Sequence, residues 1–158
     1  MLNKIAKQIH NRLRKQAKTI AVAESCTGGL LSSLLTSLPG SSDYFLLGAV
    51  TYSNKSKEII LNIPEKIITK YGAVSRPVAI LMAKNVRKKI HADLGLSITG
   101  IAGPTGALHL KPVGTVYIGL SEKNKNICSK FNFSGSREYI RKKSAQSALR
   151  LLCAHLSR

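Results

Sequence analysis

The chain has 158 residues, 44% of them hydrophobic, which suits one compact domain with a single core. It carries 25 lysines and arginines against 7 aspartates and glutamates, a formal net charge of +18 that favours an anionic partner, either a phosphorylated small molecule or a nucleic acid. No apolar run reaches the roughly 18 residues of a membrane span, and 3 scattered cysteines fit neither a disulfide framework nor a zinc motif, so we expect a cytoplasmic protein without a membrane partner.

Residues 2–18 predict the first element, an amphipathic helix. Ile5, Ile9 and Leu13 recur at helical spacing, and the remaining positions are mostly basic or polar. A basic face of this kind is more often solvated surface than a binding stripe, and an aromatic content of 5% without tryptophan gives nucleic-acid bases little to stack on. A nucleic-acid partner therefore stays an alternative that the sequence does not favour.

A strand-to-helix turn follows. Residues 19–23 predict a strand and residues 27–38 an apolar helix, with Ser25 at the turn between them. Such a turn projects its last side chain above the sheet edge, where the first free N–H groups of the helix also point. Gly28 and Gly29 allow a ligand to approach the backbone closely. Ser25 is thus either an N-cap or a functional hydroxyl, and the local pattern alone favours neither.

The middle of the chain predicts a second strand and three helices. Residues 39–42 end the preceding helix with a Pro-Gly turn, and residues 44–52 read as a strand. Helices are expected over residues 55–61 and 64–71, and a longer one begins after a serine cap at Ser75.

The last part predicts a third strand, a glycine-rich loop, a hairpin and a helix. Residues 94–99 form the strand, and residues 100–106, with three glycines and a proline, form either a backbone nest for an anion or an ordinary connection. Residues 115–120 and 127–133 predict a hairpin, and the last helix begins within residues 134–137. This order indicates a single-domain α/β fold, a layered mixed β-sheet flanked by helices.

Three candidate groups follow predicted strand ends, where open α/β sheets bind ligands. Ser25 follows the first strand, Tyr52 to Lys57 the second, and residues 100–106 the third. If these strands are parallel, the groups converge and supply a hydroxyl, an amine, a phenol and backbone donors, the parts of an acyl-transfer site that uses serine and lysine without histidine. The local pattern by itself makes Lys57 a solvent-facing helical lysine.

The sequence gives little indication of a metal site. The seven carboxylates form no cluster of the kind that holds magnesium, and the histidines lack metal-ligand spacing. We therefore expect a site without a metal or another cofactor.

Six motifs occur in order along nearly the whole chain: Ala23-Glu-Ser-Cys-Thr-Gly-Gly29, Pro39-Gly-Ser-Ser42, Thr51-Tyr-Ser-Asn54 with Lys57, Gly72-Ala-Val-Ser75, Thr99-Gly-Ile-Ala-Gly-Pro104 and Lys111-Pro-Val-Gly-Thr115. Together they resemble the nicotinamide-nucleotide amidase family, also known as the C-terminal domain of the competence/damage-inducible protein CinA. Nothing resembles the separate N-terminal domain of CinA, so residues 1–158 are expected to form one amidase domain in its stand-alone form.

The resemblance implies hydrolysis of the carboxamide of nicotinamide mononucleotide, giving nicotinate mononucleotide and ammonia in pyridine nucleotide recycling. It also implies a homodimer. Ser25 matches the family's nucleophile, and Tyr52 and Lys57 match the residues that activate it. The positions implied to bind substrate are Thr27, Gly28, Gly40, Thr99, Gly100, Ala102, Gly103 and Arg137, the last as a phosphate ligand.

Three positions depart from the family pattern. Thr105 stands where a glycine is common, Ser136 where an aspartate is common, and Arg76 where an acidic residue often occurs. The missing acidic neighbour at Ser136 is expected to affect the orientation of Arg137. The alternative function on the same fold is a basic nucleic-acid-binding or regulatory protein without amidase activity.

A lysine base also needs a lowered pKa, because an ordinary lysine has a pKa near 10.4. For Lys57 we expect burial or nearby positive charge to provide it, with Lys55 as the nearest cation in sequence.

Overall fold

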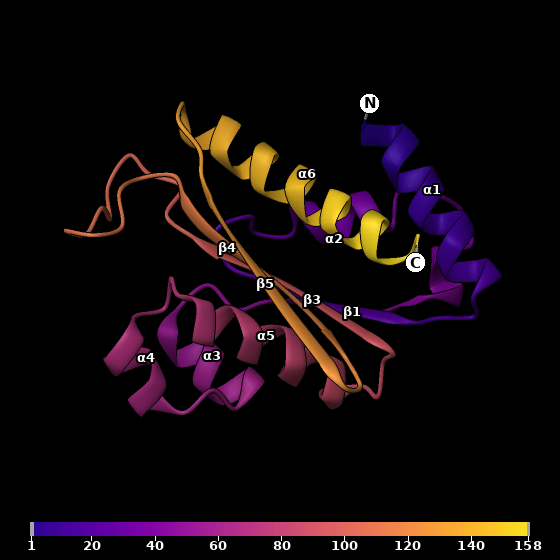
Figure 1. Cartoon of the computed structure of the whole chain (residues 1–158), viewed down its shortest axis with the longest axis horizontal. Helices are drawn as coiled ribbons and strands as arrows, with labels where there is room; N and C mark the ends of the chain where they lie inside the picture. The colour runs from indigo at the N-terminus through magenta and orange to yellow at the C-terminus, as the bar shows by residue number, and fades with distance from the viewer. Residues whose placement is uncertain (1, 158) are drawn as a thin grey trace.

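The computed structural model describes residues 2–157, with side chains from residue 4 onward, and shows a five-stranded mixed sheet flanked by helices (Figure 1). In chain order the elements are α1 (Leu2–Lys15), β1 (Ile20–Glu24), α2 (Leu30–Leu35), the 3-10 turn η1 (Ser41–Asp43), β2 (Phe45–Val50), α3 (Asn54–Leu61), α4 (Glu65–Tyr71), α5 (Arg76–Lys89), β3 (Leu94–Gly100), β4 (Thr115–Glu122), β5 (Lys125–Asn132) and α6 (Arg137–His155). The predicted α/β class is confirmed.

The sheet order β2-β1-β3-β4-β5 decides where a site can form. β1 pairs in parallel with both β2 and β3, whereas β3–β4 and β4–β5 are antiparallel pairs. The carboxyl ends of β1, β2 and β3 therefore share one edge of the sheet. The three predicted groups follow parallel strands, as their convergence at one site requires.

Two apolar cores cover the two faces of the sheet. In β1, Ile20 and Val22 enter the core beneath α1, α2 and α6, while Ala21 and Ala23 enter the core beneath α3, α4 and α5 (Figure 1). All four side chains are fully buried, as the period of two along a strand requires in a central strand with both faces covered. β1 is thus a rigid support for the turn that follows it.

The helix predicted over residues 27–38 is shorter than expected. Gly28 and Gly29 have φ values of +58° and +98°, in the left-handed region, so α2 starts only at Leu30. The residues between β1 and α2 instead form an irregular turn, and that turn carries Ser25.

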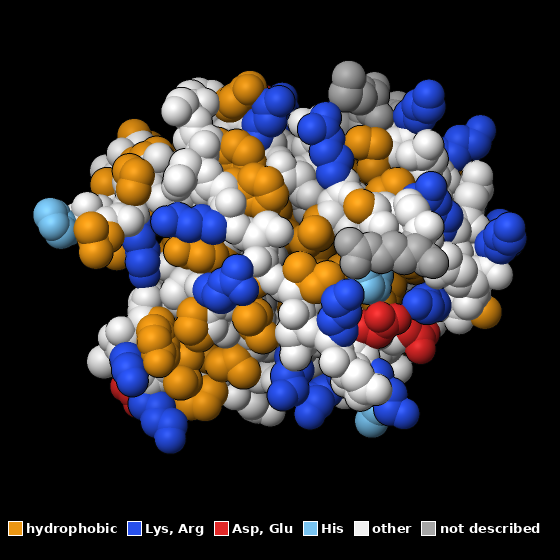
Figure 2. Space-filling model, in the orientation of Figure 1, with side chains coloured by type: hydrophobic (Ala, Val, Ile, Leu, Met, Phe, Trp, Pro, Cys, Tyr) orange, Lys and Arg blue, Asp and Glu red, His pale blue; other side chains and the backbone are white. Residues whose placement is uncertain are grey.

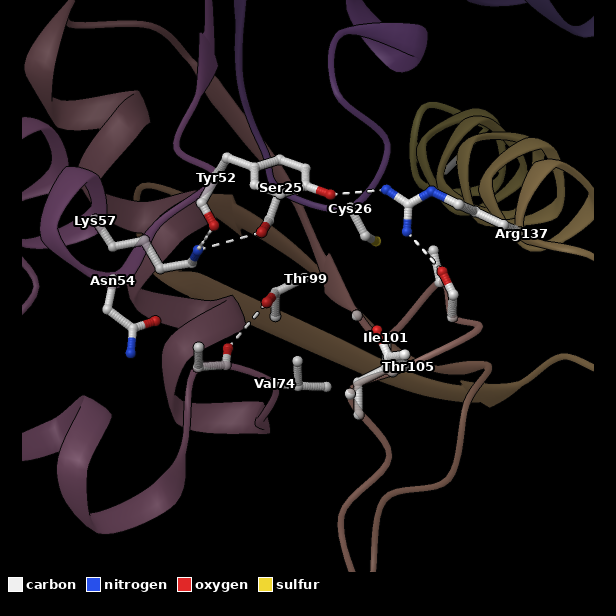
Figure 3. A pocket seen from close by; sticks show the side chains of 15 residues that line it. Ser25, Cys26, Tyr52, Asn54, Lys57, Val74, Thr99, Ile101, Thr105 and Arg137 are labelled. Carbon is white, nitrogen blue, oxygen red and sulfur yellow. Dashed lines mark hydrogen bonds between the residues drawn. The ribbon is translucent and has the colours of Figure 1, made fainter.

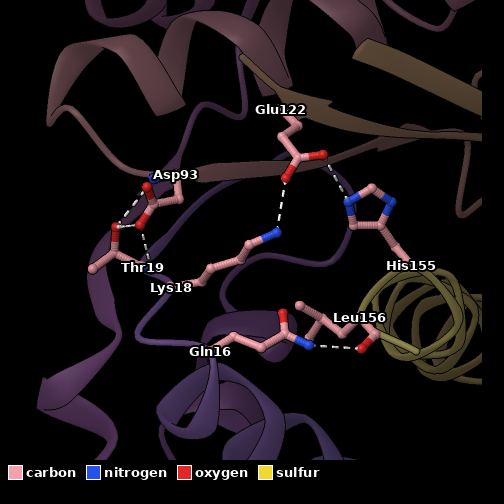
Figure 4. A network of polar contacts seen from close by, with 7 residues as sticks. All are labelled: Gln16, Lys18, Thr19, Asp93, Glu122, His155 and Leu156. Carbon is pink, nitrogen blue, oxygen red and sulfur yellow. Dashed lines mark hydrogen bonds and ion pairs between the residues drawn. The ribbon is translucent and has the colours of Figure 1, made fainter. Parts of the chain in front are cut away.

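Polar contacts lie along the edge of the sheet where β1 and β3 begin and the antiparallel β4 ends (Figure 4). The backbone N–H and hydroxyl of Thr19 both donate to Asp93 Oδ2 at 2.8 Å, and these bonds hold the pKa of Asp93 below its usual value. Lys18 Nζ lies 2.9 Å from Glu122 Oε1, and His155 Nε2 lies 3.3 Å from Glu122 Oε2. Two of the seven carboxylates therefore stabilise the edge of the sheet opposite Ser25.

Basic side chains are spread over the face of the molecule shown in Figure 2, and acidic ones occupy small areas. The lysines and arginines on this face do not gather into a single stripe. In the part of the chain that the structure describes, no helix is long and apolar enough to cross a membrane.

Candidate active site

Ser25 is held at the carboxyl end of β1. Its backbone N–H donates to Ile98 O of β3 at 3.0 Å, and its own carbonyl accepts from Gly28 N at 3.1 Å. The residue is 8% exposed, so its hydroxyl borders the cavity described below rather than open solvent. A strand-end serine fixed on both sides by backbone hydrogen bonds suits a nucleophile.

Glu24 lies directly before Ser25, and the strand pattern alone does not mark it as a functional residue. Its fully buried carboxylate accepts from Gly29 N, Leu31 N and Ser32 N at 2.8–3.1 Å, and from Ser32 Oγ at 2.6 Å. A carboxylate on the free N–H groups of a helix start is favourable, and here it replaces the side-chain cap that Gly29 cannot provide. An acidic residue inside an apolar strand was the available signal, because a buried carboxylate needs donors.

Lys57 turns inward from α3 and approaches Ser25 (Figure 3). It is 1% exposed, so the pattern-based prediction of a solvent-facing lysine is wrong. Its Nζ lies 2.7 Å from Thr51 O, 3.2 Å from Ser25 Oγ and 3.4 Å from Tyr52 O. A neutral amine has two N–H groups and one lone pair. With the two carbonyls accepting the N–H groups, the lone pair is left for the hydroxyl of Ser25.

The local environment lowers the pKa of this amine. Burial lowers the pKa of Lys57 to about 8, because an apolar surrounding disfavours the charged form. Lys55, the expected source of positive charge, instead pairs with Glu58 at 3.2 Å and leaves 75% of its side chain exposed. Of the two causes expected from the sequence, burial is therefore the one that acts.

The neighbouring thiol is a poor competitor for the same chemistry. Burial raises the pKa of Cys26 to about 11, so the thiol stays protonated at neutral pH. Lys57 lowers the pKa of Cys26 by its charge, but burial raises it more, and no hydrogen bond between Lys57 and Cys26 Sγ is found among the described residues. The local electrostatics thus favour Ser25 over Cys26 as the nucleophile.

A cavity of about 250 Å³ opens beside these groups. Eight of the sequence-predicted site residues line it: Ser25, Tyr52, Lys57, Thr99, Gly100, Ala102, Gly103 and Arg137. The loop over residues 100–106 forms one wall, and the segment between α4 and α5 forms another, held by a hydrogen bond of 2.9 Å from Thr99 Oγ1 to Ala73 O. Residues from five separate segments thus meet at the predicted edge.

Arg137 enters the cavity from the first turn of α6. Its Nη1 donates to Gly103 O at 2.7 Å and its Nη2 to the Tyr52 hydroxyl at 2.8 Å (Figure 3). Ser136 caps α6 by accepting from Tyr139 N, so the departure from aspartate still leaves Arg137 directed into the cavity. Tyr52 thus accepts a hydrogen bond from Lys57 at its backbone carbonyl and one from Arg137 at its phenol oxygen.

Three predicted substrate positions lie outside the cavity lining. Thr27 is fully buried, and its hydroxyl has no hydrogen-bond partner among the described residues. Gly28 lies beside the guanidinium of Arg141, 3.4 Å from where a Cβ would stand. Gly40 precedes the amino end of β2, near Arg14 and Asp43, at the opposite edge of the sheet. Within one copy of the chain these three residues do not join the site.

The other two departures from the family pattern have ordinary surroundings. Arg76 donates to Cys128 O at 2.8 Å and does not line the cavity, whereas Thr105 does.

The described residues contain no group of three or more potential metal ligands. The polar side chains that line the cavity therefore supply aliphatic hydroxyls, a phenol, a thiol, an amide, an amine and a guanidinium.

Comparison with known proteins gives the family. The model of the CinA C-terminal domain matches residues 2–156. The chain belongs to the CinA C-terminal domain family. A CinA-like protein from Desulfotalea psychrophila is 51% identical to this CinA C-terminal domain over 144 residues, which make up 91% of the chain and 35% of that protein. The chain thus spans about a third of the length of the curated relatives it matches.

Solved structures share the CinA C-terminal fold. The competence/damage inducible protein CihA from Agrobacterium tumefaciens has a TM-score of 0.95 and 33% identity, covering 99% of this chain and 96% of that one. The competence damage-inducible protein A from Klebsiella pneumoniae has a TM-score of 0.96 and 25% identity, covering 99% and 98%. The fold expected from the order of the predicted elements and the family expected from the six motifs are both confirmed.

Proposed function

We propose that this CinA C-terminal domain hydrolyses the carboxamide of nicotinamide mononucleotide to nicotinate mononucleotide and ammonia, in pyridine nucleotide recycling. The observation that carries the proposal is the placement of Lys57 Nζ 3.2 Å from Ser25 Oγ, with its remaining contacts on two backbone carbonyls. The choice of substrate rests on the family resemblance of the motifs.

The chemistry runs in two steps. Neutral Lys57 accepts the proton of Ser25 while Oγ attacks the amide carbon, and the protonated Lys57 then gives a proton to the leaving amine, which departs as ammonia. Water next attacks the resulting ester of Ser25, with Lys57 again accepting a proton. The ester opens to the free carboxylate, and the hydroxyl of Ser25 is restored.

Arg137 supports a phosphorylated substrate. Apart from Lys57, it is the one cationic side chain among the described residues that line the cavity. A guanidinium presents several donors in a fixed plane, which suits a phosphate group. The +18 net charge favours capture of the same anionic substrate by long-range attraction.

Arg137→Met tests this assignment. Nicotinamide mononucleotide should lose about 10- to 100-fold in kcat/KM, since a charge-assisted contact to phosphate contributes a few kcal/mol. Nicotinamide riboside, which lacks the phosphate, should lose much less. Lys142→Met, on the exposed side of the same helix, is the matched control for loss of one positive charge. An equal loss for both substrates would show that Arg137 acts through Tyr52 or Gly103 and not on phosphate.

The proposed activity is tested by ammonia and nicotinate mononucleotide release from nicotinamide mononucleotide, with and without a chelator. We expect the two products in equal amounts and the same rate in both conditions. A folded wild-type protein that releases neither product would refute this substrate assignment.

We also propose a homodimer in the cytoplasm, as the resemblance implies. β2 is an edge strand, and its apolar Leu46 and Val50 are 40% and 49% exposed. Light scattering should give about twice the 17.1 kDa chain mass, and Leu46→Lys should shift the population to monomer. A monomeric wild type would contradict the homodimer.

The free state of the three cysteines suits the reducing cytoplasm.

A further inference from the structure

The first two turns of α6 carry two arginines on one face. Arg137 and Arg141 are four residues apart, the spacing that places side chains side by side on a helix. Arg137 reaches the cavity, whereas Arg141 does not line it. Arg141 Nε instead donates to Cys26 O at 3.2 Å, and its Nη2 donates to Thr27 O at 2.8 Å.

These two carbonyls belong to the residues directly after Ser25. A peptide group is planar and trans, so holding the carbonyls of Cys26 and Thr27 also fixes the directions of the following N–H groups. One of these, Gly28 N–H, donates back to Ser25 O at 3.1 Å. The guanidinium of Arg141 therefore holds the turn that follows Ser25. One further hydrogen bond, from Gly28 N–H to Ser25 O, links that turn to the backbone of the nucleophile.

The opposite side of the same turn is held by Glu24, which accepts from the N–H groups at the start of α2. The φ of +58° at Gly28 disfavours other residues, whereas an added Cβ would make only an ordinary contact, 3.4 Å from Arg141 Nη2. The turn is thus fixed between a carboxylate on its N–H groups and a guanidinium on its carbonyls.

We propose that Arg141 is a positioning residue for Ser25: by holding the carbonyls of Cys26 and Thr27, it keeps the Ser25 hydroxyl within reach of Lys57. This inference rests on the proposed role of Ser25 as the nucleophile. Arg141 makes no contact with the cavity, so its effect is on the rate of the chemical step and not on substrate affinity.

The experiment compares Arg141→Met and Arg141→Lys with Lys142→Met, which removes a charge from the same helix without facing the turn. Two rates are measured. One is ammonia release from nicotinamide mononucleotide. The other is labelling of Ser25 by phenylmethanesulfonyl fluoride, in which Oγ bonds to sulfur, fluoride leaves and Lys57 takes the hydroxyl proton; mass spectrometry locates the label.

For Arg141→Met we expect both rates to fall about 10- to 100-fold, the cost of a small misplacement of a reacting group. KM should stay within about threefold of the wild-type value, and the midpoint of the pH–rate profile should not move. Added guanidinium ions should restore part of both rates. Arg141→Lys should be intermediate, because one ammonium cannot reproduce the fork that holds two carbonyls. Lys142→Met should match the wild type.

Folding is checked by thermal unfolding of each variant, and the Lys variant keeps the test valid if the Met variant does not fold. Unchanged labelling and turnover in a folded Arg141→Lys and Arg141→Met would overturn the inference. So would a wild type whose Ser25 resists labelling. If the wild type labels at Ser25 but releases no ammonia, the proposed substrate fails, and the labelling rates of the variants still decide the role of Arg141.

Discussion

Replacing Ser25 by alanine should lower kcat for ammonia release by about 10⁴-fold or more, because the substitution removes the atom that forms the ester intermediate. The free energy of unfolding should change by less than about 1 kcal/mol, since among the described residues the hydroxyl makes one hydrogen bond to a side chain, to Lys57 at 3.2 Å. Single-turnover ammonia release and denaturant unfolding measure the two quantities on the same preparation.

Cys26→Ala is the matched control for that variant. The thiol is adjacent to Ser25 and lines the same cavity, but its raised pKa keeps it protonated. We expect Cys26→Ala to keep its rate within about tenfold of the wild type, the remaining loss coming from a small gap in the packing. Ser25→Ala with near-normal turnover, or an inactive Cys26→Ala, would move the nucleophile assignment away from Ser25.

Replacing Lys57 by methionine should abolish turnover and make the protein more stable. Burial lowers the pKa of Lys57 to about 8, so a charged Lys57 at pH 7 costs the folded state about 3 kcal/mol relative to the unfolded chain. Lost hydrogen bonds offset part of this cost, and Lys57→Met should therefore raise the free energy of unfolding by about 2 kcal/mol. Urea unfolding at pH 7 measures the difference, and a destabilised variant would contradict it.

The sign of the pH dependence follows from the same lowered pKa. Between about pH 8 and pH 10.4 the unfolded chain keeps a proton on Lys57 that the folded chain has lost, so wild-type stability rises with pH in this window. The advantage of Lys57→Met should shrink over that range and reverse above it, where the charge penalty is gone and only the lost hydrogen bonds of Lys57 remain. For catalysis, kcat/KM should rise about tenfold per pH unit below pH 8 and level off above it, since neutral Lys57 is the base. A flat profile from pH 6 to 9 would exclude that role.

The edge of the sheet and most of the site could be predicted because they follow from chain order. Strand periodicity places Ser25, the Tyr52–Lys57 turn and the 100–106 loop after three strands, and parallel pairing of these strands brings them together. The family motifs assigned roles within that set. Neither step depends on knowing how the helices pack.

Features that depend on helix packing could not be predicted. Lys57 reads as an exposed lysine until α3 packs its inner face against the sheet and buries the amine. Arg141 reads as part of a charged helix face, yet its carbonyl partner Thr27 is 114 residues earlier in the chain. Gly40 differs from these two residues: chain order alone puts it before β2, at the other edge of the sheet, and its predicted role came from the family resemblance.

The central claim is that the carboxamide passes through an ester of Ser25, and trapping with hydroxylamine tests it most directly. Wild-type protein turning over nicotinamide mononucleotide should form the hydroxamate in place of the free acid as hydroxylamine is raised, and ammonia release should not fall, because ammonia leaves before the ester divides between water and hydroxylamine. Ser25→Ala should form neither. Turnover that forms no hydroxamate at any hydroxylamine concentration would contradict the covalent route through Ser25.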